Sequence, residues 1–544
     1  MKFFSLIKMT IALFLVMFFV AYFFSERSFP GEAPPLVVSK GNGMKSVDVG
    51  ENVLEVIGLG VTLDGYRQES LWGAIKAGNS FATIRDMDPK SYPWAAMDKS
   101  ALSSMREGAS LENALLDTPR YWGIPVFNAE IRCLDGSCQD RPDYPQGGIV
   151  EGSMGMHLFV LEHRELAERP DRILEKIFLF FERNPDVPFI AVGSADSSEL
   201  RRRYALDRQR DVDGYEVPPR PDASTLLVLA RRDRVESLRR HVFDDVEEPN
   251  RDILALNRYG IARQIFLAYL DLRKKLPVPS SVDNPVFSGA QRQPTSTEWL
   301  AETAQIAKRP DILAAAKVSL STLTNKLGIQ QRPQLRADWK PTPWFPVPWN
   351  REQLEAFDRL PTLGYLHRPV FVKIKNSEGA ALSSDSARVQ ALGNGWKEVM
   401  STLSSQEQSR QPARIILSTG NDKKQLVNFH GMLRDVAETG GREFDPTNPV
   451  EFIDTDRRLG DTGATTFFMQ IAIGLLGSYR EGGLSAAFNL REKDEASMIL
   501  ISPPSEKKRR EQQHPIGGDV FRNATVPTID PKNYEEPVMN GPRK

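Results

Sequence analysis

The sequence predicts an α/β protein in which two similar domains, each containing a βαβ unit, are joined by a Pro-rich linker and preceded by an N-terminal hydrophobic helix. Two observations lead to this prediction. In both halves of the chain, short apolar runs typical of buried strands alternate with amphipathic helical stretches, a pattern typical of parallel sheets. Between the halves, residues 277–294 are rich in Pro, Ser and Gln, as interdomain linkers are.

Composition sets limits on the function classes. The chain has 544 residues, enough for two or three domains at about 100–200 residues each. Its 70 Lys and Arg balance 71 Asp and Glu, and the formal net charge of −1 argues against a general nucleic-acid binder. Two cysteines cannot form a four-thiolate zinc site or a dense disulfide scaffold.

These patterns divide the chain into six parts. The boundaries follow changes in composition and in apolar periodicity. We predict a hydrophobic anchor or signal-like helix at 1–24, a linker at 25–49, an N-terminal α/β domain at 50–276, a linker with a helical segment and a Pro/Trp strap at 277–350, a C-terminal α/β domain at 351–502, and a disordered tail at 503–544.

The N-terminal segment resembles a membrane anchor. Thr10 is the only clearly polar residue between Met9 and Phe24, and a lysine precedes this run at positions 2 and 8. No small-x-small cleavage site follows the run, which favours an uncleaved anchor over a cleaved signal peptide. The positive-inside rule would place the body outside the cytoplasm.

Cys133 and Cys138 flank a turn signal, Asp135-Gly136. A hairpin there would bring the two sulfur atoms within bonding range, which would suit an oxidising compartment. Two independent thiols on a loop are the alternative, and the spacing does not decide between them.

The elements of the N-terminal domain follow in order. We predict strands at 54–63, 156–161, 188–193 and 225–230, helices at 69–77 and 171–183, and a loop-rich stretch from 78 to about 152. Asp171 is predicted to cap the second helix. The strand–helix–strand order at 156–193 predicts a parallel βαβ unit. A long helical segment at 250–276 closes the domain.

The linker contains the Pro/Trp strap, residues 341–350, which can be neither helix nor central strand. Its aromatic side chains either pin the strap to both domains or stand exposed for a partner. Trp344, Phe345 and Trp349 are therefore the candidate partner-binding residues.

The C-terminal domain repeats the pattern of the first. We predict strands at 370–374, 413–419, 485–491 and 497–502, and helices at 384–403, 422–438 and 465–479. The last helix is too short and too interrupted by glycine to span a membrane, so we expect it in the core.

Motifs for chemistry are scarce. Glu151 to Gly155 lacks the first glycine of a nucleophile elbow and precedes a strand instead of following one. Gly58 and Gly60 lie within a strand, where glycine marks a bulge or close packing. None of the six histidines has the spacing of a metal-ligand pair, and His367 is expected to be structural. We predict no catalytic, cofactor or metal site, and no enzyme.

Several stretches resemble the type VI secretion lipase adaptor family. They lie mostly in the first half of the chain: Gly58–Asp64, Tyr66–Gln68 with Leu71 and Trp72, Tyr121–Pro125, Met156–Val160, Leu166–Arg172, and Pro221–Ser224 followed by Arg231 and Arg232. The resemblance implies a non-catalytic adaptor. Such a protein binds a phospholipase effector and the C-terminal transthyretin-like extension of a VgrG-type spike protein, and so loads the effector for delivery.

The resemblance and the anchor imply different compartments. Effector loading implies a cytoplasmic body, tethered to the inner membrane through Met9–Phe24, whereas the lysines before this segment favour the periplasmic face. The alternative function is a membrane-anchored periplasmic binding or envelope protein. A third hypothesis is an enzyme with an unrecognised α/β site.

Overall fold

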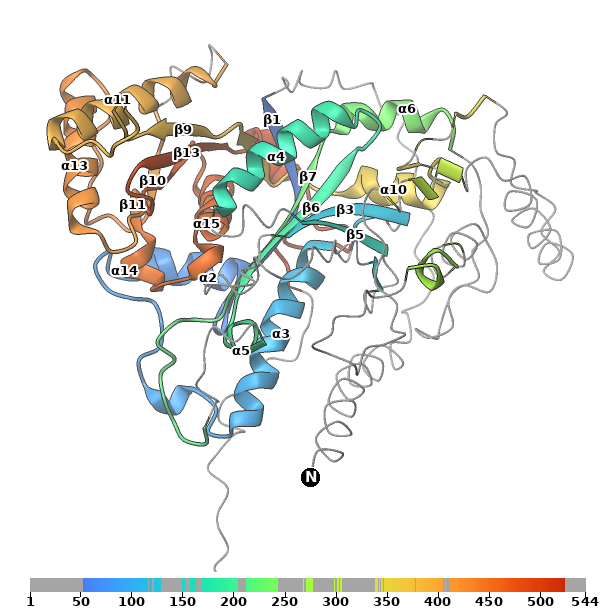
Figure 1. Ribbon diagram of the computed structural model, residues 1–544, viewed down its shortest axis with the longest axis horizontal. Coiled ribbons are helices and arrows are strands. Elements are labelled where there is room, and N and C mark those ends of the chain that lie inside the picture. Colours follow the sequence, from blue (N-terminus) through green and yellow to red (C-terminus); the bar gives the residue numbers. More distant parts are fainter. Residues whose placement is uncertain are drawn as a thin grey trace, which may run out of the picture.

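The computed structural model (Figure 1) describes residues 52–523, apart from short gaps and four longer ones at 129–148, 243–267, 277–297 and 306–337. The predicted anchor, the first linker, Cys133 and Cys138 lie outside the described residues. In the part that is described, no helix is both long enough and apolar enough to cross a bilayer.

The described elements alternate between strands and helices. In chain order they are β1 (Val53–Leu63), β2 (Tyr66–Arg67), α2 (Gln68–Ala77), η1 (Pro89–Ser91), α3 (Ala96–Leu115), β3 (Trp122–Asn128), β4 (Ile149–Glu151), β5 (His157–Glu162), α4 (Pro170–Arg183), β6 (Phe189–Asp196), α5 (Ser198–Arg203), β7 (Ala223–Ala230), η3 (Arg232–Arg234), α6 (Val235–Arg239), α10 (Arg351–Arg359), β8 (Gly364–His367), β9 (Val370–Lys373), α11 (Asp385–Ser401), β10 (Arg414–Ser418), α13 (Lys423–Glu438), β11 (Phe452–Asp454), α14 (Thr455–Leu459), η5 (Gly463–Thr465), α15 (Thr466–Glu481), β12 (Ser485–Asn489), β13 (Glu495–Ser502) and α16 (Glu506–Glu511).

The described strands form one mixed sheet in the order β11-β10-β12-β13-β8-β1-β7-β6-β3-β5-β4, with β2 beside β1 and β9 beside β13. The predicted mixed α/β class is confirmed. The two halves of the chain share this sheet because β8 pairs antiparallel with β1. As predicted, the βαβ unit is parallel: β5 and β6 both pair parallel with β3, on its two sides. β7, however, runs antiparallel to β6.

Both halves have the same strand order. From the outer edge inward the first half reads β5-β3-β6-β7-β1 and the second reads β11-β10-β12-β13-β8. Ranked along the chain, each series is third, second, fourth, fifth, first. In each series the fifth strand runs antiparallel to both of its neighbours. The two halves are therefore built on one topology, with β4 added at the edge of the first half.

Helix α15 lies in the middle of the molecule (Figure 1) and contacts β10 and β12 of the second half, β7 of the first half, and helices α2 and α4. Its residues from Thr466 to Tyr479 are all buried, as expected of a helix that is apolar on every side. The predicted core helix at 465–479 is confirmed. One large apolar cluster, which includes Trp72, Ile177 and Leu475, therefore combines side chains from both halves.

On the other face of the second half, α11 and α13 cover the sheet (Figure 1) over a second apolar cluster that includes Trp396, Phe429 and Phe488. The predicted starts of both helices are confirmed by their caps. The Ser384 side chain accepts a hydrogen bond from the Ala387 N–H, and the Asp422 side chain accepts from the two N–H groups of Lys424 and Gln425.

The stretch from 78 to 152 was predicted to be loop-rich, and this is wrong. It contains the 20-residue helix α3 and the strand β3. Helix α3 buries mainly small residues, among them Ser103, Ala109 and Ser110, so its sequence shows no apolar stripe. β3 contains Gly123 and Pro125, which are depleted in strands.

Two smaller predictions also need correction. Asp171 does not cap α4: the cap position is Arg169, Pro170 takes the first helical position, and Asp171 lies in the first turn. The chain beyond Pro503 is not disordered up to residue 523. It forms α16, capped by Ser505, and then buries Val520 and Phe521 against the common core.

Candidate functional site

The two halves of the chain meet at a group of buried charged residues, the junction network, defined as Asp64, Arg106, Asp196, Arg201 and Asp222. Each is less than a tenth exposed or, for Arg106, mostly buried. Buried charges are stable only when they are paired and hydrogen-bonded. The hydrogen-bond and ion-pair partners of each residue therefore show which parts of the chain the network connects.

Asp64 and Asp222 hold each other in place through backbone contacts. Asp64 follows β1 in a left-handed conformation (φ 46°). Its N–H donates to the Asp222 carbonyl at 2.8 Å, and the Asp222 N–H donates to the Asp64 carboxylate at 3.0 Å. Arg85 Nε donates to the other carboxylate oxygen of Asp64 at 3.2 Å. The turn after β1 is thereby fixed to the start of β7.

Asp222 also connects two helices. Its carboxylate accepts from Arg106 of α3 and from the Ser198 N–H at the start of α5, both at 2.7 Å. Burial would lower the pKa of Arg106, but the charges of Asp222 and Asp64 raise it above its usual value. Burial raises the pKa of Asp64, and Arg106 opposes that shift.

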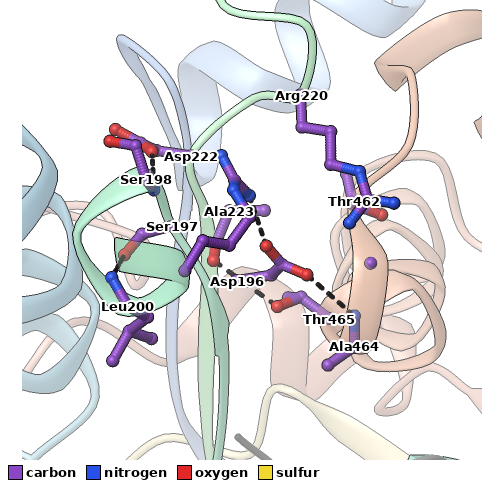
Figure 2. A network of polar contacts seen from close by, with 12 residues as sticks. Asp196, Ser197, Ser198, Leu200, Arg220, Asp222, Ala223, Thr462, Ala464 and Thr465 are labelled. Atoms are coloured by element: carbon purple, nitrogen blue, oxygen red, sulfur yellow. Dashed lines mark hydrogen bonds and ion pairs between the residues drawn. The ribbon is translucent and has the colours of Figure 1, made fainter. Parts of the chain in front are cut away.

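Asp196, at the end of β6, extends the network to the second half. Its carboxylate pairs with Arg201 of α5 and accepts from the Ala464 N–H at 3.3 Å, in the turn before α15. Figure 2 shows this carboxylate pointing toward the Ala464 backbone. Burial raises the pKa of Asp196, against the effect of Arg201.

The turn at Gly463 is shaped to admit Asp196. Gly463 has a φ of +55°, and a Cβ there would lie 1.6 Å from Asp196 Oδ2. Next to it, Ser194 Oγ donates to the Ala464 carbonyl at 3.2 Å. The network is therefore a structural connection between the halves. Among the described residues, no group of three or more His, Cys, Asp or Glu side chains could hold a metal ion.

Further polar contacts hold the halves together. The Arg458 side chain, 1% exposed, donates to the Ile75 carbonyl at 2.8 Å and the Ala82 carbonyl at 2.7 Å, around the C-terminal end of α2. Such a donor satisfies carbonyls that a helix end leaves unpaired. At the cap position before α4, Arg169 pairs with Glu495 of β13 at 2.5 Å.

The three predicted partner-binding residues are buried. Trp344, Phe345 and Trp349 are 5%, 2% and 1% exposed. Trp344 Nε1 donates to Asn184 at 2.9 Å, and the Trp349 ring lies 6.2 Å from that of Phe189 in β6. The Trp349 ring also lies 5.3 Å from that of Phe357 in α10. This is the predicted arrangement in which the aromatic residues pin the strap to both halves. Their burial does not support the prediction that these three residues bind a partner.

His367 has the structural position that we predicted. It is 2% exposed, and its Nε2 lies 2.7 Å from Ser502 Oγ. The nearby carboxylate, Glu407, contacts that hydroxyl at 3.2 Å. A catalytic triad needs an exposed serine and an acid on the other histidine nitrogen, so this group does not match one. Burial lowers the pKa of His367, and the charge of Glu407 opposes that shift.

A surface lobe, formed by residues 78–100 and 212–220, was not singled out by the sequence. It carries four of the six large apolar side chains that are exposed among the described residues: Phe81, Met87, Met97 and Val212. Met87 and Val212 each stand between two aspartates, and none of the four belongs to an apolar run with helix or strand periodicity, so no local pattern marks them. Only the folded chain brings the two segments together.

Two family models match the two halves of the chain. The N-terminal model of the type VI lipase adapter protein Tla3 matches residues 52–213, and the C-terminal model matches residues 363–503. Together they cover more than half of the chain. The chain belongs to this family. The resemblance seen in the sequence is thereby confirmed, and the second match covers a half in which few specific motifs were visible.

Solved structures resemble the chain only weakly. Matches include the ishigamide ketosynthase/chain length factor (8% identity, 83% of this chain and 100% of that chain, TM-score 0.34). A ketosynthase from module 6 of the bacillaene synthase of Bacillus subtilis 168 has 8% identity, covers 83% and 72%, and has a TM-score of 0.38. OleA of Xanthomonas campestris has 12% identity, covers 83% and 96%, and has a TM-score of 0.28. At these scores none carries a conclusion about this member of the Tla3 family.

Proposed function

We propose that this chain is a non-catalytic adaptor that binds a phospholipase effector of type VI secretion and delivers it to a VgrG-type spike protein. The observation that carries the proposal is the pair of family matches, one on each half, to a type VI lipase adapter. On the spike, we propose the C-terminal transthyretin-like extension as the docking site.

A rigid body with two separate outer surfaces suits this task. The halves share one sheet, one apolar core and the junction network. On the outside, α11 and α13 cover the second half, whereas the surface lobe projects beside α3 and α5 of the first half. A protein that holds two partners at a fixed separation raises the effective concentration of one at the other.

For the compartment, we propose a cytoplasmic body tethered to the inner membrane through Met9–Phe24. Effector loading precedes delivery, so adaptor, effector and spike must share one side of the membrane. Fractionation of the source bacterium would test this point. Recovery of the full chain in the inner membrane, with its body protected from protease added outside that membrane, is the expected result.

The experiment that tests the function is a pull-down of the tagged full-length chain from its own bacterium, followed by mass spectrometry. The full chain is required because α16, Val520 and Phe521 contribute to the fold. Recovery of a lipase together with a spike protein is expected. Recovery of neither at low salt would contradict the proposal. A tagged unrelated α/β protein serves as the control for nonspecific capture.

A further inference from the structure

Hydrogen bonds hold the two segments of the surface lobe against each other and against the junction network. Its two segments lie side by side below α5 in Figure 1. The Gly214 N–H donates to the Trp94 carbonyl at 2.8 Å, and the Ala96 N–H donates to the Asp213 carboxylate at 3.0 Å. Arg85, whose Nε donates to Asp64, also donates from Nη2 to the Pro218 carbonyl at 2.8 Å and so connects the lobe to the junction network. A preformed surface binds a partner without the entropy cost of ordering a loop.

Met97 and Val212 are exposed apolar side chains on adjoining segments of the lobe. They are 80% and 61% exposed. Lys99 Nζ donates to the Val212 carbonyl at 2.9 Å, and the Ala96 contact with Asp213 brings the start of α3 against the same segment. The two side chains therefore lie on neighbouring backbone segments. Met87, 59% exposed, lies on the loop that leads to them.

The lobe exposes several large apolar side chains, although contact of such side chains with water is unfavourable. Single exposed apolar residues are common on soluble proteins, but clusters mark interaction surfaces. Methionine is frequent on such surfaces because its flexible, polarisable side chain adapts to the partner.

The rim of the lobe is acidic. Asp86, Asp88, Asp213 and Glu216 are exposed there, against the bases Lys90, which is exposed, and Arg220, which is partly exposed and paired with Asp461 at 2.9 Å. Lys99 is only 11% exposed and is paired with Glu216 at 3.0 Å. Hydrogen bonds from Ser91 and from the Asp88 N–H lower the pKa of Asp86 further below neutral pH. Exposed apolar side chains with an acidic rim are complementary to an apolar patch surrounded by Lys and Arg.

We propose that the surface lobe is the docking site for the lipase effector, and that it binds an apolar patch of the lipase rimmed by basic residues. This inference rests on the proposed adaptor function, and the lipase is chosen because it is the partner that the family description names.

The test measures the affinity of the purified full-length chain for the type VI lipase of the same bacterium. The lobe variant combines Met97→Lys with Val212→Lys. The matched control combines Val427→Lys with Ile516→Lys, at side chains that are 69% and 58% exposed but lie outside the lobe. Both double variants add the same charge, and thermal unfolding verifies that both remain folded.

We expect the lobe variant to bind the lipase at least about tenfold more weakly than the wild type, as for the loss of a central interface anchor. The control should stay within about twofold of the wild type. Raising the salt from about 50 mM to about 500 mM should weaken wild-type binding because it screens the acidic rim.

Three outcomes would overturn the inference. If the wild-type chain binds the lipase and the lobe variant binds it as tightly as the control does, the lobe is not the docking site for the lipase, and the proposed adaptor function is unaffected. If the lobe variant loses a spike protein but keeps the lipase, the lobe belongs to the other partner. If the wild-type chain binds no lipase, the proposed function fails together with this inference.

Discussion

The two halves share one strand order but bring their first long helix onto the sheet in opposite ways. In the first half the glycines lie in the strand: a Cβ on Gly60 would lie 1.8 Å from the backbone carbonyl oxygen of Ser110 in α3. In the second half the glycine lies in the helix: a Cβ on Gly395 of α11 would lie 2.1 Å from a methyl group of Val372 in β9. The first contact joins backbone to backbone, and the second joins a backbone to a side chain.

This difference determines how much each half tolerates change. Backbone cannot move aside without shifting a helix, whereas a side chain can repack at a smaller cost. The first half, which also carries the surface lobe beside the start of α3, should therefore tolerate substitutions at its helix–strand contact less well than the second half. The following predictions compare the halves, from the largest expected effect to the smallest.

Gly60→Ala should destabilise the protein by about 3 kcal/mol, because the new methyl group meets the α3 backbone. Gly395→Ala should cost only about 1 kcal/mol, since Val372 can give way and alanine favours the helix. Chemical denaturation of the full-length variants measures both. Equal losses would contradict the proposed difference between the halves.

Arg458→Met should destabilise the protein by about 2 kcal/mol, because the carbonyls of Ile75 and Ala82 lose a buried donor at the contact between the halves. The matched control is Arg457→Met on the same helix. Arg457 is exposed and lies over the Phe81 ring at 5.4 Å, so its loss should cost less than about 1 kcal/mol. If Arg457→Met destabilised the protein more than Arg458→Met, the contact of Arg458 with α2 would not be the main contribution of α14 to stability.

Gly108→Ala in α3 and Gly393→Ala in α11 should each stabilise the protein by about 0.7 kcal/mol. Among the described residues, no atom from outside the neighbouring turns of its own helix lies within 4 Å of the position where a Cβ on either glycine would stand. Alanine gains helix propensity at such sites. The two halves should respond alike here, because only the glycines at the helix–strand contact differ. A loss of stability at either position, measured in the same denaturation experiment, would contradict the prediction that the new methyl group meets no other part of the protein.

Glu495→Gln should lower the stability at neutral pH by about 0.5 kcal/mol, the modest value of an ion pair that solvent still reaches. Burial would raise the pKa of Glu495, but hydrogen bonds from Arg172 and Arg169 hold it below the usual value of 4.5. Because the folded pKa is the lower one, this contribution is present above pH 4.5 and is lost as the pH falls through the folded pKa.

The measurement for Glu495 is the difference in unfolding free energy between variant and wild type across acidic pH. That difference should shrink as the pH falls below about 4.5. Glu438→Gln, at a side chain that is 69% exposed, is the control and should show no such change. A constant difference for Glu495→Gln would contradict the charge-dependent contact between α4 and β13.

Much of the second half could be predicted from the sequence, because α11 and α13 begin with recognisable caps and α15 is a mostly apolar run. In the first half α3 escaped prediction, since a helix that packs closely against strand glycines buries small residues such as Ser110 and Ala114. The pairing of β1 with β8 depends on hydrogen bonds between residues far apart in the chain, and no local pattern reports it.

The site was less predictable than the fold. The aromatic residues of the strap were recognised as contact residues, but the sequence could not say whether Trp344 contacts a partner or, as the structure has it, Asn184 of the same chain. The surface lobe forms only when residues 212–220 fold against the start of α3. Its isolated methionines therefore have no signature along the chain.

The proposed function requires one molecule of this chain to hold the lipase and the spike at the same time. The most direct test immobilises the spike protein, adds the lipase, and measures lipase retention with and without the full-length chain. We expect retention only when the chain is present, and a strong loss of retention with the Met97→Lys, Val212→Lys variant. Equal retention without the chain, or none with it, would contradict the proposed function.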